Sequence, residues 1–466
     1  MTSIRLFLAM TAMAMMAAAP AHAEDAAGDW GGRIANSLGV FLKLEKSASG
    51  NWEGTLTVPQ QDLVTKVDRL VVTDEQVSFA LLRLNATYTA RWNAQDRAWA
   101  GNWVQQGQTV PLALQRTAPG AATPKRPQEA AIHARAPAYT SSVVTFDNAA
   151  AGVALEGTLT VPHGKGPFPA VVLVHGSGPF DRDEDIFKHK LFLVLADHLS
   201  SRGIAVLRYD KRGVGRSSGT YADATTFDFA ADAGAALRFL RGRPEVDARH
   251  VGIVGHSEGG LIAPLLAARD PDVAFIVMLA GPGMRGELLM VEQIALRSRA
   301  NGAPDAVVAR ERELNKAMFA LLAQEPDVQA ARAKVTALID AAGRDGTLPA
   351  GMNKALVTAF STPWFLAFLR HEPGPVLRAV RQPVLALNGA LDMQVPAAPD
   401  LAAIRAALAD NPRATVTELP RLNHLFQTAT TGAGTEYATI EETMAPLALA
   451  TVGDWIHATV RQGSAR

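Results

Sequence analysis

The pentapeptide Gly255-His256-Ser257-Glu258-Gly259 is the best guide to the architecture of this 466-residue chain. The residues before it, 250–255, form a short apolar run with β-branched side chains, which is typical of a buried strand. The residues after it, 260–268, are rich in alanine and leucine and indicate a helix. A G-x-S-x-G pattern between a strand and a helix predicts a tight turn that projects the Ser257 hydroxyl above the carboxyl edge of a sheet. The alternative is a plain glycine-rich turn.

Length and composition favour a well-packed protein of two domains. Hydrophobic residues make up 48% of the chain and charged residues 19%, which allows a large core. Lysine plus arginine equals aspartate plus glutamate, 45 of each, so the net charge gives no reason to expect nucleic acid or an anionic membrane surface as a partner. The absence of cysteine excludes disulfides, thiolate zinc sites and cysteine nucleophiles.

The N-terminus has the pattern of a secretory signal peptide. Residues 1–5 carry a positive charge, residues 6–19 form an apolar run, and Ala21-His22-Ala23 matches a cleavage site. The apolar run is shorter than the roughly 20 residues of a spanning helix, which argues against an uncleaved membrane anchor. We therefore expect residues 1–23 to be removed after Ala23 and the mature protein to be periplasmic or secreted, with no membrane span.

Residues 24–116 predict a separate β-rich domain. Apolar and polar side chains alternate in short runs, for example at 52–58 and 77–81, and turn residues separate the runs. Strands of this kind suggest a small antiparallel barrel or sandwich. Its role is open between a packing or accessory module and a barrel that binds carbohydrate, lipid or substrate. Residues 117–140, with several prolines among alanines and charges, predict an extended, semi-rigid linker.

Residues 141–466 alternate between apolar runs and helical stretches. The runs are 143–146, 155–161, 170–174, 204–209, 251–254, 274–279, 384–387 and 415–419, and the helical stretches between them are 191–202, 225–242 and 261–269. This pattern predicts a mainly parallel sheet with helices on both faces, led by an antiparallel pair. From about 284 to 378 amphipathic helices predict a cap over the strand ends. The aromatic segment 360–368 either lines an acyl pocket or packs the cap onto the sheet.

A serine nucleophile needs a base and an orienting carboxylate, and in this fold they follow the serine in the order acid, then histidine. Asp392 ends a turn directly after the apolar run 384–387, and His424 follows the run 415–419. Both residues therefore come just after a core strand, as Ser257 does. The chain predicts a catalytic triad of Ser257, Asp392 and His424.

Other residues could compete for the two supporting roles. Asp400 is the alternative acid, but it lies further on, at the start of a Pro/Ala-rich helix. His371 lies in a turn and His457 lies within the last helix, so neither follows a core strand.

The oxyanion of a tetrahedral intermediate needs two N–H donors. We expect one to be the backbone N–H of Glu258, at a helix N-terminus where the dipole favours negative charge, without a role for its side chain. The second should come from the loop after the run 170–174, with the N–H of Ser177 favoured over that of Gly178. His175 is expected to brace this loop.

The segment Asp210–Gly219 briefly suggests a dinucleotide fingerprint, but the third glycine is missing and no helix follows at once. We interpret it as a surface loop beside the site. The chain contains neither a phosphate-binding G-x-x-x-x-G-K-[ST] motif nor an H-E-x-x-H zinc motif. We therefore predict no metal site and no nucleotide cofactor.

From about Ser141 onward the chain resembles the α/β-hydrolase superfamily, and within it exported bacterial esterases of the serine-aminopeptidase-like hydrolase group. The segments that carry the resemblance are His175–Asp183, Tyr209–Gly213, Gly255–Gly260, Pro363–Phe365 and Pro383–Gly389 followed by Asp392. The resemblance implies a cofactor-free serine hydrolase acting on esters with short to medium acyl chains, with Ser257 as nucleophile, His424 as base and Asp392 as orienting acid. Some esterases of this type are similar in carrying a β-rich N-terminal domain.

Three functions remain in competition. The first is a carboxylic ester hydrolase that forms an acyl-enzyme. The second is an exported peptidase or amidase of the same fold, which would need a charged pocket for a free amino terminus; a thioesterase is a weaker variant. The third is a binding protein built on an inactive hydrolase fold. The sequence leaves open the acyl and alcohol preference and the oligomeric state.

Overall fold

The computed structural model describes residues 26–464, apart from 35–37, 62, 106, 122–124, 345–356 and 358–359. The predicted signal peptide lies outside the described residues. The chain separates into two compact units, Met1–Pro124 and Lys125–Arg466. Among the described residues, no helix has the length and apolar character needed to cross a membrane.

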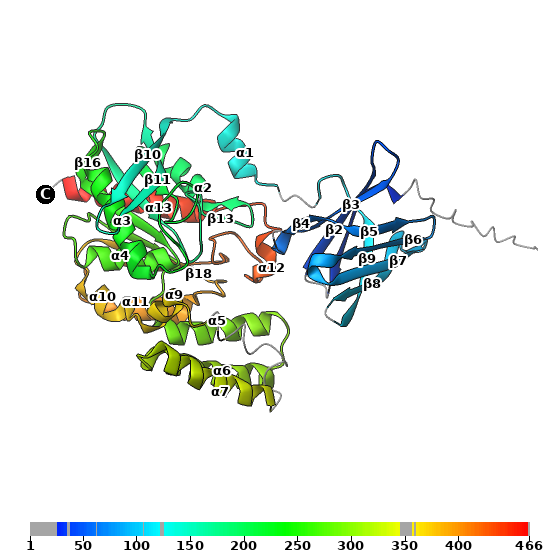
Figure 1. Ribbon diagram of the computed structural model, residues 1–466. Helices are drawn as coiled ribbons and strands as arrows, with labels where there is room; N and C mark the ends of the chain where they lie inside the picture. The colour runs from blue at the N-terminus through cyan, green and yellow to red at the C-terminus, as the bar shows by residue number, and fades with distance from the viewer. Residues whose placement is uncertain are drawn as a thin grey trace, which may run out of the picture. The chain divides into compact units, whose positions relative to one another are not determined.

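The first unit is one antiparallel sheet of nine strands (Figure 1). The strands are β1 (Gly28–Ile34), β2 (Leu38–Lys46), β3 (Trp52–Val58), β4 (Leu63–Lys66), β5 (Asp68–Val72), β6 (Gln76–Leu81), β7 (Ala86–Asn93), β8 (Ala98–Gln105) and β9 (Gln108–Arg116), with single 3₁₀ turns at Pro59–Gln61 and Leu82–Leu84. The order is β4-β3-β2-β1-β9-β8-β7-β6-β5. The two ends of this order, β4 and β5, approach each other because only Val67 separates them in the chain, and the Val67 N–H donates to the Gly54 carbonyl of β3 at 3.0 Å. The sheet is therefore barrel-like, as the alternating sequence predicts.

Aromatic side chains fill the inside of this unit. Trp30, Tyr88 and Trp99 are almost fully buried, and they pack with the leucines and valines of the inward-facing positions. The Tyr88 hydroxyl lies 2.7 Å from the Trp99 carbonyl and 3.1 Å from that of Leu112, so this buried polar group is satisfied.

The second unit is built on an eight-stranded sheet in the order β10-β11-β15-β12-β16-β17-β18-β19. These strands are β10 (Tyr139–Asn148), β11 (Val153–Pro162), β12 (Phe168–Val174), β15 (Ala205–Tyr209), β16 (Val246–His256), β17 (Ile276–Leu279), β18 (Val384–Gly389) and β19 (Ala414–Leu419), and a small separate hairpin joins β13 (Asp185–Ile186) to β14 (His189–Lys190). The leading pair β10–β11 is antiparallel and the strands from β15 to β19 are mutually parallel. The predicted mixed, mainly parallel sheet is confirmed.

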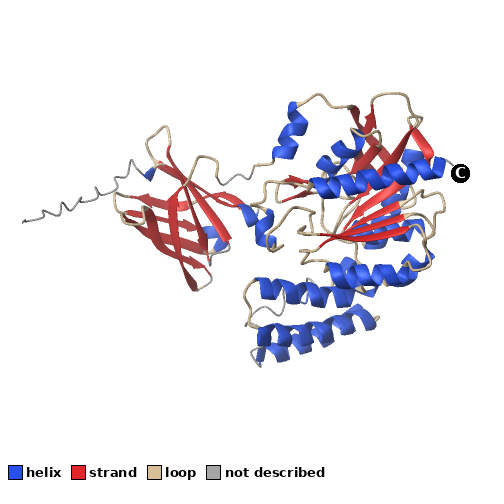
Figure 2. Cartoon of the chain, turned by 180° about the vertical axis from the view of Figure 1, so that it is seen from behind, coloured by secondary structure: helices blue, strands red, loops and turns tan. Residues whose placement is uncertain are grey.

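Helices cover both faces of this sheet (Figure 2). The described helices of this unit outside the cap are α1 (Pro127–Ala134), α2 (Leu191–Ser200), α3 (Thr226–Arg241), α4 (Glu258–Ala267), α10 (Pro373–Ala379), α11 (Ala397–Ala407), α12 (Gly434–Tyr437) and α13 (Pro446–Ser464). Along β12, Val171 and Leu173 join one apolar cluster with α2 and α13, whereas Val172 and Val174 join the other with α3 and α4. Successive strand side chains point to opposite faces, so a strand buried on both sides reads as a continuous apolar run.

The cap consists of α5 (Gly286–Ala300), α6 (Asp305–Gln324), α7 (Val328–Arg344) and α9 (Pro363–Arg370), which lie below the sheet in Figure 1. It has an apolar core of its own, to which α9 contributes Phe365 and Leu369. Phe368 packs against Leu261 of α4, so the aromatic segment joins the cap to the sheet-covering helices. Of the two roles considered for this segment, the structure favours packing.

The extended linker predicted for 117–140 is wrong for residues 127–134, which form α1. Pro127 occupies the first turn, where its missing N–H has no helical partner to lose. Gln128 binds the backbone of Thr443 and Met444, and Glu129 accepts from the Thr443 hydroxyl. These contacts with residues more than 300 positions away explain why the local sequence did not indicate the helix.

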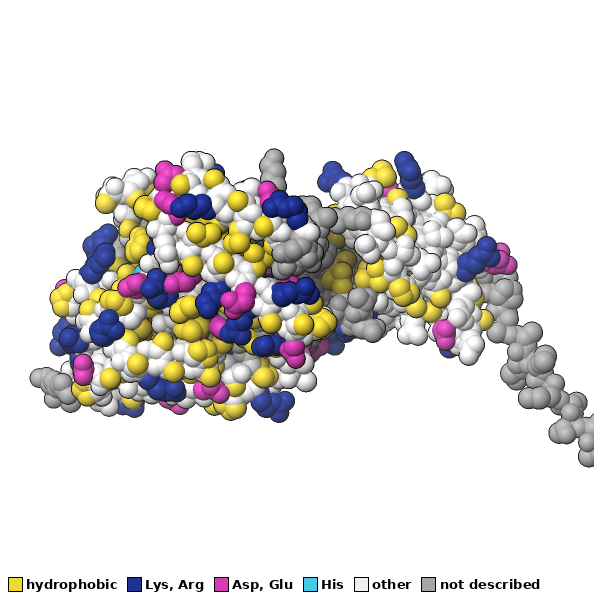
Figure 3. Space-filling view, turned by 90° about the horizontal axis from the view of Figure 1, so that it is seen from below, with side chains coloured by type: hydrophobic (Ala, Val, Ile, Leu, Met, Phe, Trp, Pro, Cys, Tyr) yellow, Lys and Arg dark blue, Asp and Glu magenta, His cyan; other side chains and the backbone are white. Residues whose placement is uncertain are grey.

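Figure 3 shows lysine and arginine side chains interspersed with aspartate and glutamate over the face in view. Neither positive nor negative side chains dominate this face, in keeping with the equal numbers of acidic and basic residues in the chain.

Candidate active site

Ser257 occupies the turn between β16 and α4, in the strained conformation that the pentapeptide predicts. Its φ is 52° and its ψ is −113°, which is unfavourable for a residue with a side chain. The flanking glycines are required by close approach: a Cβ at Gly255 would lie 2.0 Å from the Gly259 carbonyl oxygen, and one at Gly259 would lie 2.0 Å from that of Val174. The turn therefore holds the serine at the carboxyl edge of the sheet.

The structure brings Asp392 and His424 together. His424 Nδ1 donates to Asp392 Oδ2 at 2.8 Å, and both residues are buried. The other carboxylate oxygen accepts the N–H groups of Gln394 at 2.7 Å and Val395 at 2.9 Å. Because Nδ1 carries the proton in this arrangement, Nε2 is left as an acceptor when the ring is neutral.

The competing residues lie elsewhere. Asp400 accepts the N–H groups of Gly283 at 2.8 Å and Met284 at 3.0 Å, at the start of the cap, and burial raises its pKa to about 6. His371 is buried at the end of α9, and His457 lies within α13.

The loop after β12 runs directly beside Ser257. A Cβ at Gly176 would lie only 3.1 Å from the Ser257 Cβ. The next residue, Ser177, is exposed, and no hydrogen bond from its N–H to a described residue is recorded. The fallback donor Gly178 hydrogen-bonds the Tyr221 side chain through its backbone. Glu258 is the first residue of α4, where the N–H has no partner in the helix.

A cavity of about 310 Å³ is lined by two of the three predicted catalytic residues. Ser257 and His424 line it, together with Ser177 from the β12 loop. Most of the remaining wall is apolar, and its polar members are Glu184, His256, Arg297, Gln394 and Tyr437. The sequence did not single out Glu184, Arg297 or Tyr437. Glu184 directly follows the segment His175–Asp183, which carries part of the family resemblance. This position was the one feature of the sequence that could have pointed to Glu184 as a residue of the site.

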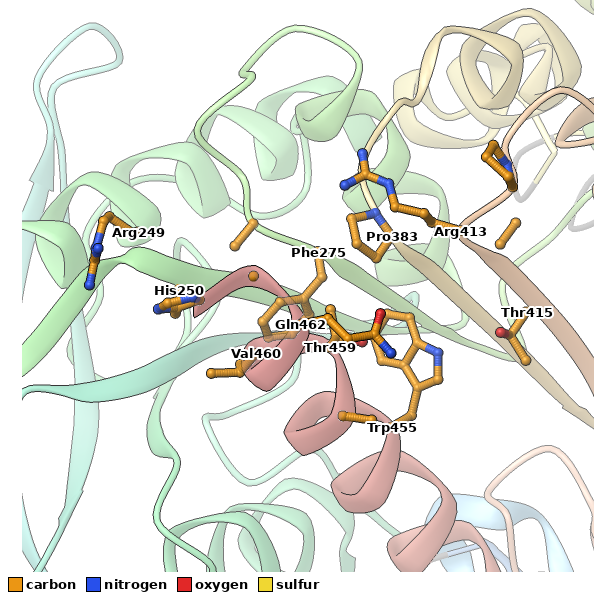
Figure 4. Close-up of a pocket in the computed structure, with 15 residues that line it drawn as sticks. Arg249, His250, Phe275, Pro383, Arg413, Thr415, Trp455, Thr459, Val460 and Gln462 are labelled. Carbon is orange, nitrogen blue, oxygen red and sulfur yellow. The ribbon is translucent and has the colours of Figure 1, made fainter. Parts of the chain in front are cut away.

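A larger hollow of about 500 Å³ lies at the amino ends of the parallel strands (Figure 4). Phe275 and Trp455 contribute its apolar wall, and Arg249 and His250 are both paired with Asp247. Active sites in sheets of this kind lie at the carboxyl ends of the strands. The smaller cavity at Ser257 is therefore the candidate site.

The model that describes the alpha/beta hydrolase family matches residues 171–432, more than half of the chain, and this range includes 257, 392 and 424. The chain belongs to the alpha/beta hydrolase family. Among the described residues, no group of three or more histidine, aspartate or glutamate side chains is arranged to hold a metal ion.

Two curated proteins are similar to part of this chain. Esterase EstD of Thermotoga maritima is 42% identical over 144 residues, which cover 30% of this chain and 33% of EstD. Thiohydrolase apmlB of Arthrinium phaeospermum is 30% identical over 162 residues, which cover 33% of this chain and 49% of that protein. The chain thus spans a third to a half of the length of these curated relatives.

Solved structures also align with this chain. Est1E from Butyrivibrio proteoclasticus, solved with ferulic acid bound, is 17% identical, with 68% of this chain and 99% of Est1E covered and a TM-score of 0.41. The Pyrococcus furiosus esterase Pf2001 is 18% identical, with 69% and 92% covered and a TM-score of 0.41.

A buried polar network lies behind Ser257. Glu258 Oε1 accepts from the Thr226 hydroxyl at 2.7 Å and from Trp364 Nε1 of the cap at 2.6 Å. Its other oxygen faces Lys211 Nζ at 3.3 Å, and Lys211 also donates to the Gly176 carbonyl at 2.6 Å. The Glu258 side chain, to which the sequence assigned no role, thus joins α4, the loop after β12 and the cap.

The prediction of a surface loop at 210–219 is wrong for its first residues. Asp210, Lys211 and Arg212 are 3%, 2% and 7% exposed. Asp210 pairs with Arg182 at 2.6 Å, and Arg212 pairs with Asp232 at 2.7 Å. Partners distant in the chain allow these charges to be buried, which composition alone does not reveal.

Replacing Lys211 with methionine is expected to lower the free energy of unfolding by about 3–5 kcal/mol, because it leaves the Glu258 carboxylate buried without a cation. Urea denaturation of the whole chain measures the effect. Lys190→Met is the matched control, since the Lys190 side chain is 39% exposed and lies 3.4 Å from Asp183, and it should cost less than about 1 kcal/mol. Equal losses for the two variants would contradict the role given to Lys211.

Proposed function

We propose that the protein is a carboxylic ester hydrolase that acts through an acyl-enzyme on Ser257, with His424 as base and Asp392 as orienting acid. We also propose that it is exported and that the mature protein begins after Ala23. The observation that carries the proposal is a strained serine that shares a cavity with a histidine whose Nδ1–H is held by a buried carboxylate. The resemblance to EstD supports ester chemistry, and the Met1–Ala23 pattern supports export.

The proposed chemistry begins with the transfer of a proton from Ser257 to His424. His424 Nε2 accepts the Ser257 hydroxyl proton while Oγ attacks the carbonyl carbon of the ester. The N–H groups of Ser177 and Glu258 receive the oxyanion, and the positive end of α4 favours the same charge. His424 then gives the proton to the leaving alcohol. A water molecule, activated by the same imidazole, cleaves the acyl-enzyme and restores the serine.

The size and wall of the cavity support a short to medium acyl chain. About 310 Å³ lies at the small end of the range of ligand pockets, and Phe180, Ile186, Phe187 and Leu425 give it apolar surface. The β-rich first unit then has an accessory role, because its inward-facing positions are occupied by its own side chains.

The charge of the cavity favours an ester over an aminopeptidase substrate. An aminopeptidase needs an accessible carboxylate for the free amino group. Glu184 lines the cavity, but its side chain is fully buried and its Oε1 already accepts two hydrogen bonds. Arg297 of α5 also lines the cavity, is exposed, and forms no ion pair with a described residue. A guanidinium in this place repels an ammonium group.

A substrate pair that differs only in the amino group tests this assignment. We expect faster turnover of p-nitrophenyl butyrate than of alanine p-nitroanilide, and faster turnover of propionyl p-nitroanilide than of the alanine compound. Arg297→Gln should raise kcat/KM for the alanine compound about fivefold relative to the propionyl compound, the effect of about 1 kcal/mol of repulsion at a few ångströms.

Arg299→Gln is the control for this test, since Arg299 lies on the same helix, 3.7 Å from Asp305. It should leave the ratio unchanged. Preferred turnover of the alanine compound by the wild-type protein would instead support the peptidase.

A further inference from the structure

A second acid–imidazole pair lies beside the proposed triad. His256 Nδ1 is 3.0 Å from Glu184 Oε1, and His256 Nε2 is 3.0 Å from the backbone carbonyl oxygen of His424. Both side chains are buried, at 0% exposed for Glu184 and 1% for His256. The rings of His256 and His424 lie 5.0 Å apart between centroids. The pair is therefore in contact with the loop that carries the proposed base.

The hydrogen-bond partners determine the charge of this pair. A carbonyl oxygen can only accept, so His256 Nε2 must carry a proton, and a carboxylate can only accept, so Nδ1 must carry one as well. His256 is thus an imidazolium beside the Glu184 carboxylate. Burial acts to lower the pKa of His256, but the charge and hydrogen bond of Glu184 outweigh it and leave the pKa raised. Burial likewise opposes ionisation of Glu184, yet His256 keeps the pKa of that carboxyl below its usual value.

The same pair contacts each part of the proposed machinery. Glu184 Oε1 also accepts the Gly176 N–H at 2.6 Å, next to the oxyanion donor Ser177. His256 directly precedes Ser257 in the chain. Its Nε2–H fixes the carbonyl of His424. One buried ion pair thus connects the oxyanion loop, the nucleophile turn and the base loop.

Stability alone gives a weak reason for burying this pair, since apolar side chains of similar volume usually do as well. Glu184 also has a φ of 48°, a conformation that costs free energy for a residue with a side chain. Its second oxygen, Oε2, is buried with no partner among the described residues. Strained backbone conformations and unusual buried charges of this kind are concentrated at functional sites.

We propose that Glu184 and His256 are positioning residues. The Glu184 carboxylate keeps both ring nitrogens of His256 protonated, and the pair thereby holds the oxyanion loop, Ser257 and His424 at the distances that catalysis requires. The inference rests on the proposed ester hydrolysis. The pair takes no part in proton transfer to the substrate, because both protons of the imidazolium are held by oxygen acceptors.

Glu184→Gln removes the charge that keeps the proton on His256. A neutral imidazole can donate from one nitrogen only, so one bond of the network is lost in either amide orientation. If the amide oxygen takes the place of Oε1, Nδ1–H donates to it and the bond to the His424 carbonyl is lost. If the amide nitrogen takes that place, it donates to Nδ1 and the Gly176 N–H loses its acceptor. We expect kcat for p-nitrophenyl butyrate to fall about 10- to 100-fold with KM changed less than about threefold, since a displacement of about 1 Å has costs of this order. Active sites are counted with a fluorophosphonate, so a loss of folded protein is separated from a loss of turnover.

Glu129→Gln is the matched control. Glu129 is also buried, accepts from Thr443 Oγ1 and Lys190 N–H, and has one oxygen without a described partner, but it does not line the cavity. It should retain the wild-type kcat. His256→Asn should resemble Glu184→Gln in kcat.

Nitrogen-15 NMR of histidine rings tests the charge without reference to activity. The charged or titratable groups around the pair are His175, Lys211, Asp392 and His424. In the wild-type protein at pH 8 we expect one ring with both nitrogens protonated, absent in His256→Asn and in Glu184→Gln. A neutral His256 at pH 8, or wild-type kcat in Glu184→Gln, would overturn the inference. If the wild-type protein cleaves no ester, the proposed function fails, and the NMR result still decides the charge of the pair.

Discussion

Replacing Ser257 with alanine is expected to lower ester hydrolysis by at least three orders of magnitude, because the groups of a catalytic triad act as a unit. The change removes one oxygen atom, and alanine fits the space between the flanking glycines. The fold should therefore persist, with circular dichroism and melting temperature close to those of the wild-type protein. Initial rates with p-nitrophenyl butyrate measure the loss.

A variant that keeps more than a tenth of the wild-type rate while folded would show that another group attacks the ester. That result would favour a hydrolase with a different nucleophile, or a binding protein built on an inactive hydrolase fold.

Asp392→Asn is expected to lower kcat by about 10²- to 10⁴-fold with little change in KM. Asp392 Oδ1 accepts two backbone N–H groups, so the amide oxygen of asparagine should take that position and its NH₂ should face His424 Nδ1. Nδ1 must then accept, which leaves the proton on Nε2. In that tautomer His424 cannot receive the proton of Ser257. Steady-state kinetics with p-nitrophenyl butyrate measure the effect.

Asp400→Asn is the control, since Asp400 is equally buried but binds the backbone at the start of the cap. Its oxygen can still accept from Gly283 and Met284, so we expect kcat within about threefold of wild type. A larger loss in Asp400→Asn than in Asp392→Asn would exchange the roles of the two residues.

The sequence predicted those parts of the fold in which the same physical requirement determines both the local residue pattern and the structure. β12 is a continuous apolar run because both of its faces are buried, and the Ser257 turn is recognisable because only glycine fits at 255 and 259. The cap helices α6 and α7 carry their own amphipathic period, so their existence and approximate limits could be predicted.

Contacts between distant residues could not be predicted in the same way. Glu184 and His256 are 72 residues apart, and each resembles an ordinary polar residue in its local segment. Helix α1 depends on residues 443–444, and the burial of Lys211 depends on Glu258. In each case a partner brought in by the fold determines the environment, so the pairing becomes visible only in three dimensions.

The central claim is that Ser257 is an activated nucleophile, and its most direct test is covalent labelling. The wild-type protein is treated with a fluorophosphonate at neutral pH, digested and mapped by mass spectrometry. An ordinary serine hydroxyl does not react, whereas one that His424 can deprotonate does. We expect a single adduct on the peptide that contains Ser257, and none in Asp392→Asn under the same conditions. An unlabelled Ser257 in folded wild-type protein, or an adduct on another residue, would contradict the account.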